Sequence, residues 1–253
     1  MKKKIIIPII LVIALIIGYF GVKLFYLYYY NIDSATLTDY SNFIDSLKIT
    51  DTMVITKSET EDYLSFKNIK VKNEFSNFKK LENQYSEDTI KYVLHDENNN
   101  VKASFWMGTT VSYIDTFRND SSIFFTYGKR ITNDTLIEIL DENKVTNDIQ
   151  LLNYLVSMKN VKNNIFTSVK AMKKNYAIQF MVAAMMPQIE SVTMIDGDYT
   201  GFIYNMKQQG SLSNVYEARI ISDNKVYFFT FLSKDDYFSK QDINRILNSV
   251  EFE

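Results

Sequence analysis

The only histidine of the chain, His95, is the side chain whose ordinary pKa suits acid–base catalysis at neutral pH. It stands in a polar segment, directly before Asp96 and Glu97. The motifs G-x-S-x-G, G-x-G-x-x-G, H-E-x-x-H and the P-loop are all absent, so no nucleophile or phosphate loop accompanies it. We therefore expect an exposed loop histidine, assign no catalytic residue and predict that the protein is not an enzyme.

The chain has no cysteine, which excludes disulfides, thiolate catalysis, Cys-ligated metals and a lipid-modified N-terminal cysteine. A carboxylate pair for glycoside hydrolysis is close in space but distant in sequence. With 30 Asp and Glu residues some pair is always available, so the sequence does not identify one. We predict no cofactor and no metal centre.

Asp196-Gly197-Asp198 has a pattern that offers two oxygen ligands to a calcium ion. A calcium loop of the EF-hand type needs a longer run of acidic residues that ends in a bidentate glutamate, and that run is missing here. The same triplet, placed between two strand-forming stretches, is a strong signal for a hairpin turn. We therefore favour a plain turn over a cation site.

Two features are candidates for contact with a partner. Glu59, Glu61 and Asp62 form an acidic cluster before a strand-forming stretch, and they are either a solvated loop or a contact patch for a basic partner. Trp106 is the only tryptophan, and tryptophan is enriched at recognition surfaces. In an alternating strand it lies on the face opposite to its neighbours, so it is either exposed for a protein or glycan contact or covered by the helical segment that follows.

The strongest signal lies at the N-terminus. A basic tail (residues 1–4) precedes an uncharged run, Ile5–Val22, of 18 residues, which spans about 27 Å as a helix and matches a bilayer. A tyrosine-rich stretch at 24–30 resembles an interfacial aromatic belt. We predict a transmembrane signal-anchor helix over 5–30, with the N-terminus in the cytoplasm and the rest outside the cell membrane.

Two other interpretations of this segment stay open. A cleaved signal peptide needs small residues at the cleavage site, and large residues flank Gly18 and Gly21. A buried core helix of a soluble protein is the other alternative. Lysine far outnumbers arginine and isoleucine far outnumbers alanine, a bias typical of AT-rich bacterial genomes.

The charge balance limits the partners. The net charge is -2, without the basic excess of a nucleic-acid-binding protein. Without the four lysines at 2, 3, 4 and 23, the chain keeps 24 of its 28 basic residues against 30 acidic ones. The part outside the membrane is therefore acidic, which does not favour binding to anionic lipid or wall polymer through bulk charge.

The rest of the chain combines helical and strand periodicities. Helices are predicted over 37–47, 132–140, 146–156, 168–186 and 239–250, and strand-forming stretches over 52–56, 63–71, 89–94, 101–107, 189–195, 199–206, 215–222 and 225–232. This order predicts an α+β fold, a largely antiparallel β-sheet covered by helices. We expect one extracytoplasmic domain over 31–253 with a helical insert at about 111–187.

The C-terminal stretch Tyr199–Glu253 resembles the corresponding part of the PsbP-like secreted and membrane-anchored bacterial proteins. The similarity lies in a glycine-containing hairpin, a strand at 216–222, the turn Asp223-Asn224, an aromatic strand at 226–231 and a closing helix. The resemblance implies a sheet-and-helix fold, and the family offers no shared active site. The long helical insert departs from the family pattern.

The sequence thus favours a single-pass membrane protein that acts as a non-catalytic protein-binding module at the cell surface, through an extracytoplasmic protein partner. One alternative is a membrane-anchored immunity protein, whose acidic exposed part would face a basic exported toxin. A cell-envelope hydrolase and a scaffold acting through the transmembrane helix itself are the others.

Overall fold

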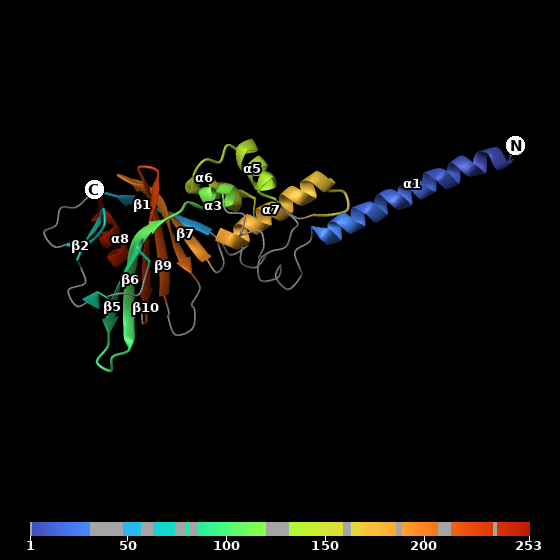
Figure 1. Cartoon of the computed structure of the whole chain (residues 1–253). Helices are drawn as coiled ribbons and strands as arrows, with labels where there is room; N and C mark the ends of the chain where they lie inside the picture. The colour runs from blue at the N-terminus through green and yellow to red at the C-terminus, as the bar shows by residue number, and fades with distance from the viewer. Residues whose placement is uncertain are drawn as a thin grey trace. The chain divides into compact units, whose positions relative to one another are not determined.

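The computed structural model describes residues 2–30, 48–56, 63–73, 79–80, 86–119, 132–158, 163–185, 189–206, 214–234 and 237–253 (Figure 1). These residues form two compact units. A helical unit combines Met1–Asp45 with Tyr113–Pro187, and a sheet unit combines Ser46–Ser112 with Gln188–Glu253. The expectation that residues 31–253 form a single domain stays a prediction.

The described helices of the helical unit are α1 (Lys2–Tyr29), α3 (Tyr113–Asn119), α5 (Asn133–Glu142), α6 (Asp148–Ser157) and α7 (Val169–Met185). The predicted helices at 132–140, 146–156 and 168–186 are therefore present. The predicted helix at 37–47 lies outside the described residues. In α7, the side chains from Tyr176 to Val182 are buried apart from the half-buried Gln179, and Ala177 and Met181 are fully buried.

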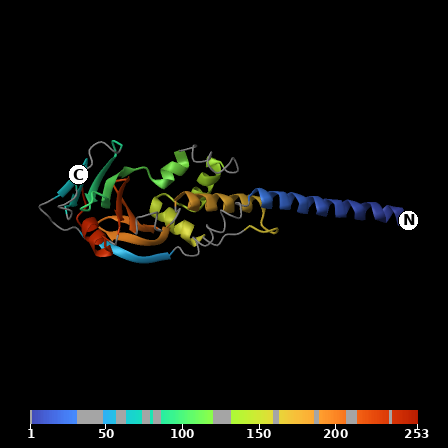
Figure 2. The ribbon, with the colours of Figure 1, turned by 90° about the horizontal axis from the view of Figure 1, so that it is seen from below.

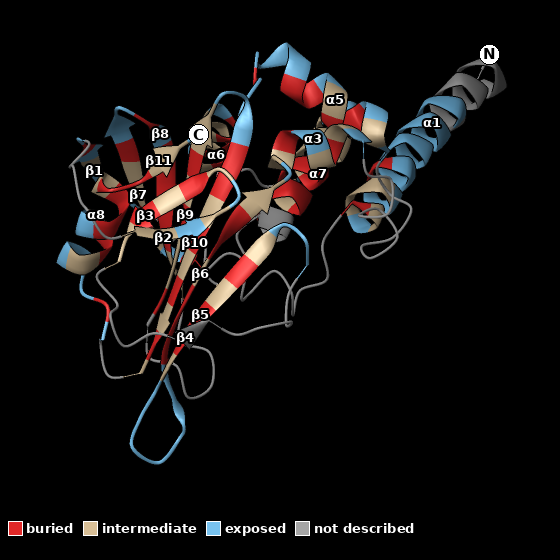
Figure 3. Cartoon of the chain, turned by 60° about the vertical axis from the view of Figure 1, so that its left-hand side comes forward, coloured by how far each residue is buried: buried red, intermediate tan, exposed pale blue. Residues whose placement is uncertain are grey.

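Helix α1 is long and apolar enough to cross a membrane, a property that a signal sequence shares. The span Leu11–Tyr29 has a mean hydropathy of 2.0 and is almost entirely exposed (Figure 3). Its C-terminal end packs against α7, where the rings of Tyr30 and Tyr176 lie 6.1 Å apart. There Lys23 is buried and its Nζ donates a hydrogen bond to the carbonyl of Thr167.

Two identical Thr-Asn-Asp triplets begin α5 and α6 in different registers. Helix α5 has Thr132 as its N-cap, whose hydroxyl bonds to the Thr135 hydroxyl at 3.2 Å but accepts no bond from a first-turn amide, and Asp134 is exposed. Helix α6 begins one residue later in its triplet, with Asn147 as the N-cap accepting a bond from the Gln150 amide at 2.9 Å. This shift buries Asp148, which is 1% exposed.

The sheet unit contains an eight-stranded sheet and a three-stranded sheet. In the first the strand order is β1-β7-β8-β9-β10-β6-β5-β4, and in the second it is β11-β3-β2. The strand bounds are β1 Lys48–Ile55, β2 Tyr63–Phe66, β3 Ile69–Lys72, β4 Lys79–Lys80, β5 Thr89–His95, β6 Val101–Thr110, β7 Ile189–Gly197, β8 Thr200–Met206, β9 Asn214–Ser222, β10 Lys225–Ser233 and β11 Glu251–Phe252. Only β1 and β7 pair in parallel among the described strands, which confirms an α+β fold with a mostly antiparallel sheet.

The strand-forming stretch at 63–71 contains two strands rather than one. Strands β2 and β3 pair antiparallel around Lys67, whose φ of 51° reverses the chain. The turn Asp223-Asn224 likewise has positive φ at both residues (49° and 60°), the requirement of a tight hairpin turn. These turns set the register of the strands that they join.

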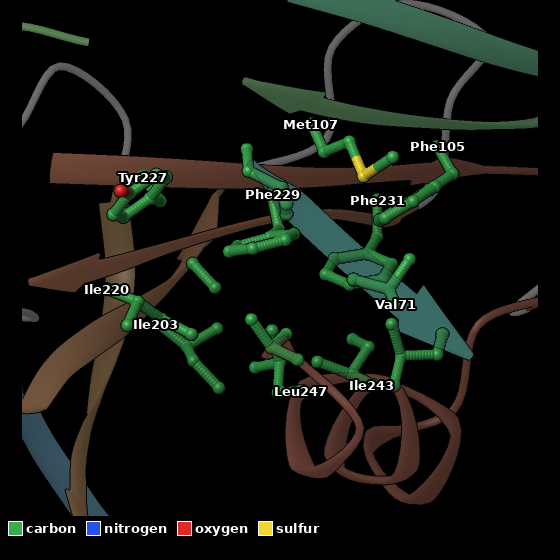
Figure 4. Packing of buried hydrophobic residues seen from close by; sticks show 14 of the residues in the cluster. Val71, Phe105, Met107, Ile203, Ile220, Tyr227, Phe229, Phe231, Ile243 and Leu247 are labelled. Atoms are coloured by element: carbon green, nitrogen blue, oxygen red, sulfur yellow. The ribbon is translucent and has the colours of Figure 1, made fainter. Parts of the chain in front are cut away.

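One face of the large sheet carries the core of this unit. Phe105 and Met107 of β6, with Phe229 and Phe231 of β10, are fully buried on it (Figure 4). Helix α8 (Lys240–Asn248) lies against this face next to β1 and contributes Ile243, Ile246 and Leu247 (Figure 2). A capping box begins the helix: Ser239 accepts a bond from the Asp242 amide, and the Asp242 side chain accepts one from the Ser239 amide.

Gly197 joins β7 to the turn before β8, and we expect Gly197→Ala to lower the free energy of unfolding by about 1–3 kcal/mol. Its φ is +112°, and a Cβ there would lie 2.3 Å from the carbonyl oxygen of Ile55 in β1. Urea unfolding of the full chain in non-ionic detergent measures the loss. Thr200→Ala, at an exposed position at the start of β8, is the control, and equal losses in both variants would contradict this account.

Candidate binding site

A pocket with a volume of about 320 Å³ lies in the sheet unit, beside the N-terminal half of α8. Four strands and the helix form its walls. The lining residues are Asp51, Thr52, Met53 and Val54 of β1, Ser191 and Thr193 of β7, Ile203 and Asn205 of β8, Tyr216 of β9, and Lys240, Gln241, Ile243 and Asn244 of α8. Its size is at the lower end of the range of small-molecule sites, about 300–1,000 Å³.

The pocket exists because the core face of the sheet changes from apolar to polar toward one end. In β8, Ile203 is buried and Asn205, two residues later on the same face, is half-buried. Asn205 pairs in register with Ser191 of β7 and Tyr216 of β9. These three polar side chains follow the apolar residues along the core face of the sheet and form the floor of the pocket beside α8.

Helix α8 adds a wall of amide groups. Asn244 follows Lys240 at i+4 and Gln241 at i+3, so the three side chains share one side of the helix. The Oδ1 atom of Asn244 is buried and has no hydrogen-bond partner among the described residues. Leaving a buried acceptor without a donor costs about 1–3 kcal/mol, so such a group calls for an explanation.

One acid and one base stand at the rim. Asp51 and Lys240 are both exposed, and neither forms an ion pair with any residue in the described part of the chain. An Oδ1 atom of Asp51 accepts a bond from the Thr52 amide at 2.8 Å. The pocket therefore has no net charge to select an anion or a cation, and its inner groups are neutral amides, hydroxyls and apolar side chains.

Trp106 lies on the other face of the large sheet, away from Phe105 and Met107, and is partly exposed. The Nζ atom of Lys91 lies 4.6 Å from its ring centroid, within the range of a cation–π contact. Its Nε1 donates a 3.3 Å bond to the Oγ atom of Ser104. The ring is thus held in place on a strand.

A row of polar side chains crosses the strands at the level of Trp106. The paired residues along this row are Lys91, Trp106, Thr230 and Glu217. Glu217 forms a 2.8 Å ion pair with Arg219 on the same strand. We call this set, Lys91, Trp106, Thr230, Glu217 and Arg219, the Trp106 surface.

The other predicted contact residues, Glu59, Glu61 and Asp62, lie outside the described residues. At the limits predicted for the membrane segment, Val22 is 54% exposed, and the side chain of Ile5 is outside the described part.

The acidic turns at Asp96 and Asp196 use their carboxylates for hydrogen bonds within the turn. His95 is exposed at the end of β5, and the Asp96 carboxylate accepts bonds from the Asn98 and Asn100 amides at 2.9 and 2.8 Å. The Asn100 backbone bond holds the pKa of Asp96 below its ordinary value. Asp196 accepts a bond from the Gly197 amide, so its carboxylate serves the turn itself.

No metal centre is found among the described residues, since no group of three or more His, Asp or Glu side chains gathers there. The sequence did not point to the pocket. A usable signal was present in the same-face alternation of β7 and β8, where apolar residues give way to Ser191, Thr193 and Asn205.

No protein-family model matches the chain, and no curated protein matches its sequence.

Proposed function

We propose that this protein is a single-pass membrane protein whose exposed part is a non-catalytic binding module for another protein. The observation that carries the proposal is the Trp106 surface in a chain that begins with a membrane-length apolar helix. Aromatic residues are enriched at protein interfaces, and this surface carries the partly exposed Trp106 on a strand.

The membrane part of the proposal rests on the first 30 residues. The three lysines before Ile5 favour a cytoplasmic N-terminus under the positive-inside rule, which leaves 31–253 outside. The contact of Lys23 with Thr167 supports an apolar span that ends near Val22, because a buried lysine bound to a carbonyl belongs to the folded unit. The anchor would then continue directly into the helical unit.

The partner that we propose is a basic protein, attracted by the overall acidic charge of the part beyond the apolar span rather than by the Trp106 surface, which carries two cationic side chains and one anionic one. The part beyond the apolar span has more acidic than basic residues, and charge complementarity accelerates association and excludes partners of like charge. An immunity protein against a basic exported toxin is a specific form of the same idea, favoured by the same acidic balance. The PsbP-like resemblance stays a proposal about ancestry, supported by the order β9, β10 and α8.

Site-specific photo-crosslinking in intact producing cells tests the proposal. A photoreactive amino acid at position 106 should give a discrete crosslinked species with one basic protein. Position 237 is the matched control, because Tyr237 is another partly exposed aromatic residue, with the Nζ atom of Lys102 at 5.4 Å from its ring. The same species from both positions, or none from position 106, would contradict protein binding through this surface.

The transmembrane helix itself is the object of a second experiment. Residues 1–30 are replaced by an unrelated membrane anchor, and the crosslink at position 106 is measured again. A binding module should keep the crosslink, whereas a scaffold that acts through its helix should lose it.

A further inference from the structure

We infer that the pocket beside α8 binds a neutral sugar of one or two rings. This inference goes beyond protein binding and does not depend on it, because the pocket and the Trp106 surface lie on opposite faces of the same sheet. It concerns the sheet unit alone, since every lining residue belongs to that unit.

The first argument is the match of hydrogen-bonding groups. A sugar hydroxyl is both donor and acceptor, and so is the side-chain amide of asparagine or glutamine. The pocket presents three such amides, on Asn205, Gln241 and Asn244. It adds the hydroxyls of Ser191 and Thr193, of which the latter lies 3.4 Å from the Thr50 hydroxyl.

The second argument is the buried acceptor of Asn244. Its Oδ1 atom is buried and has no partner within the described residues, and Asn244 is one of the residues that line the pocket. A rotation of the Asn244 side chain toward the pocket would bring this atom within reach of a hydroxyl donor from a bound molecule, which would satisfy it. A buried acceptor without a donor destabilises the folded state. A ligand that supplies the missing donor removes this cost and therefore binds more tightly.

The third argument is the apolar part of the lining. Met53, Ile203, Ile243 and the ring of Tyr216 lie among the polar groups. A sugar ring has C–H faces as well as hydroxyl edges, so it needs such a mixed wall. A fully polar ligand would leave these side chains without a complementary surface.

The charges exclude other ligand classes. Lys240 is the one cationic side chain in the pocket lining, and Asp51 is the one anionic side chain there. A phosphate site uses several cationic groups or an array of amide donors, and a calcium site uses several oxygen ligands with excess negative charge. Neither set is present in this lining, whereas a neutral ligand suits a pocket with balanced charge.

Binding is tested with the full chain in non-ionic detergent. The probes are glucose, N-acetylglucosamine, maltose and N,N′-diacetylchitobiose, each measured by isothermal titration calorimetry and by the shift in thermal unfolding. Inorganic phosphate and glycine are the charged and zwitterionic comparisons. We expect at least one neutral sugar to bind and to raise the Tm, with no effect of phosphate or glycine.

Two variants connect the binding to the pocket. Asn244→Leu removes the buried acceptor, so we expect it to keep or raise the Tm without sugar and to weaken sugar binding at least tenfold. Gln241→Ala changes an exposed helical position and should weaken binding without loss of folding. Asn98→Ala, in the exposed hairpin turn before β6, is the control and should bind as the unchanged protein does.

A sedimentation assay distinguishes the two sources of such a sugar, a cell-wall polymer and a free saccharide. Binding to purified cell-wall glycan but not to the soluble sugars would identify a polymer as the ligand, and binding to soluble sugars would identify a free saccharide. Either result supports the pocket chemistry when Asn244→Leu abolishes it. The inference is overturned if neither source binds, if the two variants bind normally, or if phosphate or glycine binds instead.

Discussion

Replacing Phe229 by alanine is expected to lower the free energy of unfolding of the sheet unit by about 3–5 kcal/mol. Phe229 is fully buried on β10, between β9 and β6, and its ring stacks with that of Phe105 at 6.5 Å. Its register neighbours Ala218 and Met107 are also fully buried. The truncation therefore leaves a cavity that the neighbouring strands, held by hydrogen bonds on both sides, cannot fill.

Phe228→Ala is the matched control for this loss. Phe228 precedes Phe229 on the same strand, has the same side chain and is half-exposed on the opposite face. The single tryptophan, Trp106, pairs with Thr230 of β10 and gives a fluorescence signal from the sheet unit during urea unfolding. A loss in Phe228→Ala as large as that in Phe229→Ala would contradict the assignment of the core to the α8 face.

The second large effect is expected in the helical unit, where Asp148→Ala should cost about 2–4 kcal/mol. The two carboxylate oxygens of Asp148 accept bonds from the backbone amides of Tyr113 and Ile114, both at 3.1 Å. These amides begin α3 and have no partner inside that helix. Hydrogen bonds from backbone amides to an ionised carboxylate are strong, and removing the Asp148 carboxylate leaves both amide donors without their acceptor.

The matched control is Asp134→Ala, since Asp134 ends the identical triplet at the start of α5 but is exposed. We expect that variant to change stability by less than about 1 kcal/mol. Hydrogen exchange measures the difference: the Tyr113 and Ile114 amides should exchange faster in Asp148→Ala and at the normal rate in Asp134→Ala. Unchanged protection of both amides in Asp148→Ala would refute the role of this carboxylate.

The element types were predictable where local signals agree. Ser239 with Asp242 marks the start of α8, and Asp223-Asn224 marks the β9–β10 turn, because in both cases the chemistry is contained within four residues. The alternation of 101–107 also placed Phe105 and Met107 together on the face opposite to Trp106, and both are fully buried.

Other features depend on contacts that are distant in sequence. The two Thr-Asn-Asp triplets are identical in sequence, whereas the amides of Tyr113 and Ile114, supplied by α3, bind Asp148 and not Asp134. The parallel pairing of β1 with β7 joins segments about 140 residues apart. The pocket needs four strands and a helix at once, so the polar alternation in β7 and β8 could not indicate it without the other three elements.

The central claim of this account, an uncleaved anchor with the folded part outside the cell membrane, is tested most directly by cysteine labelling. The chain has no cysteine, so a single introduced one is the sole reactive thiol. Asn98→Cys stands in an exposed hairpin turn of the sheet unit, and Lys3→Cys stands in the basic tail. The reagent is a membrane-impermeant maleimide, applied to intact cells and to lysed cells.

We expect Asn98→Cys to be labelled in intact cells and Lys3→Cys only after lysis, with both labelled chains of full length in the membrane fraction. Labelling of Asn98→Cys only after lysis would reverse the orientation. A shortened chain released from the membrane, with no full-length chain carrying the Lys3→Cys label after lysis, would show that the N-terminal helix is a removed signal sequence and would contradict the anchor.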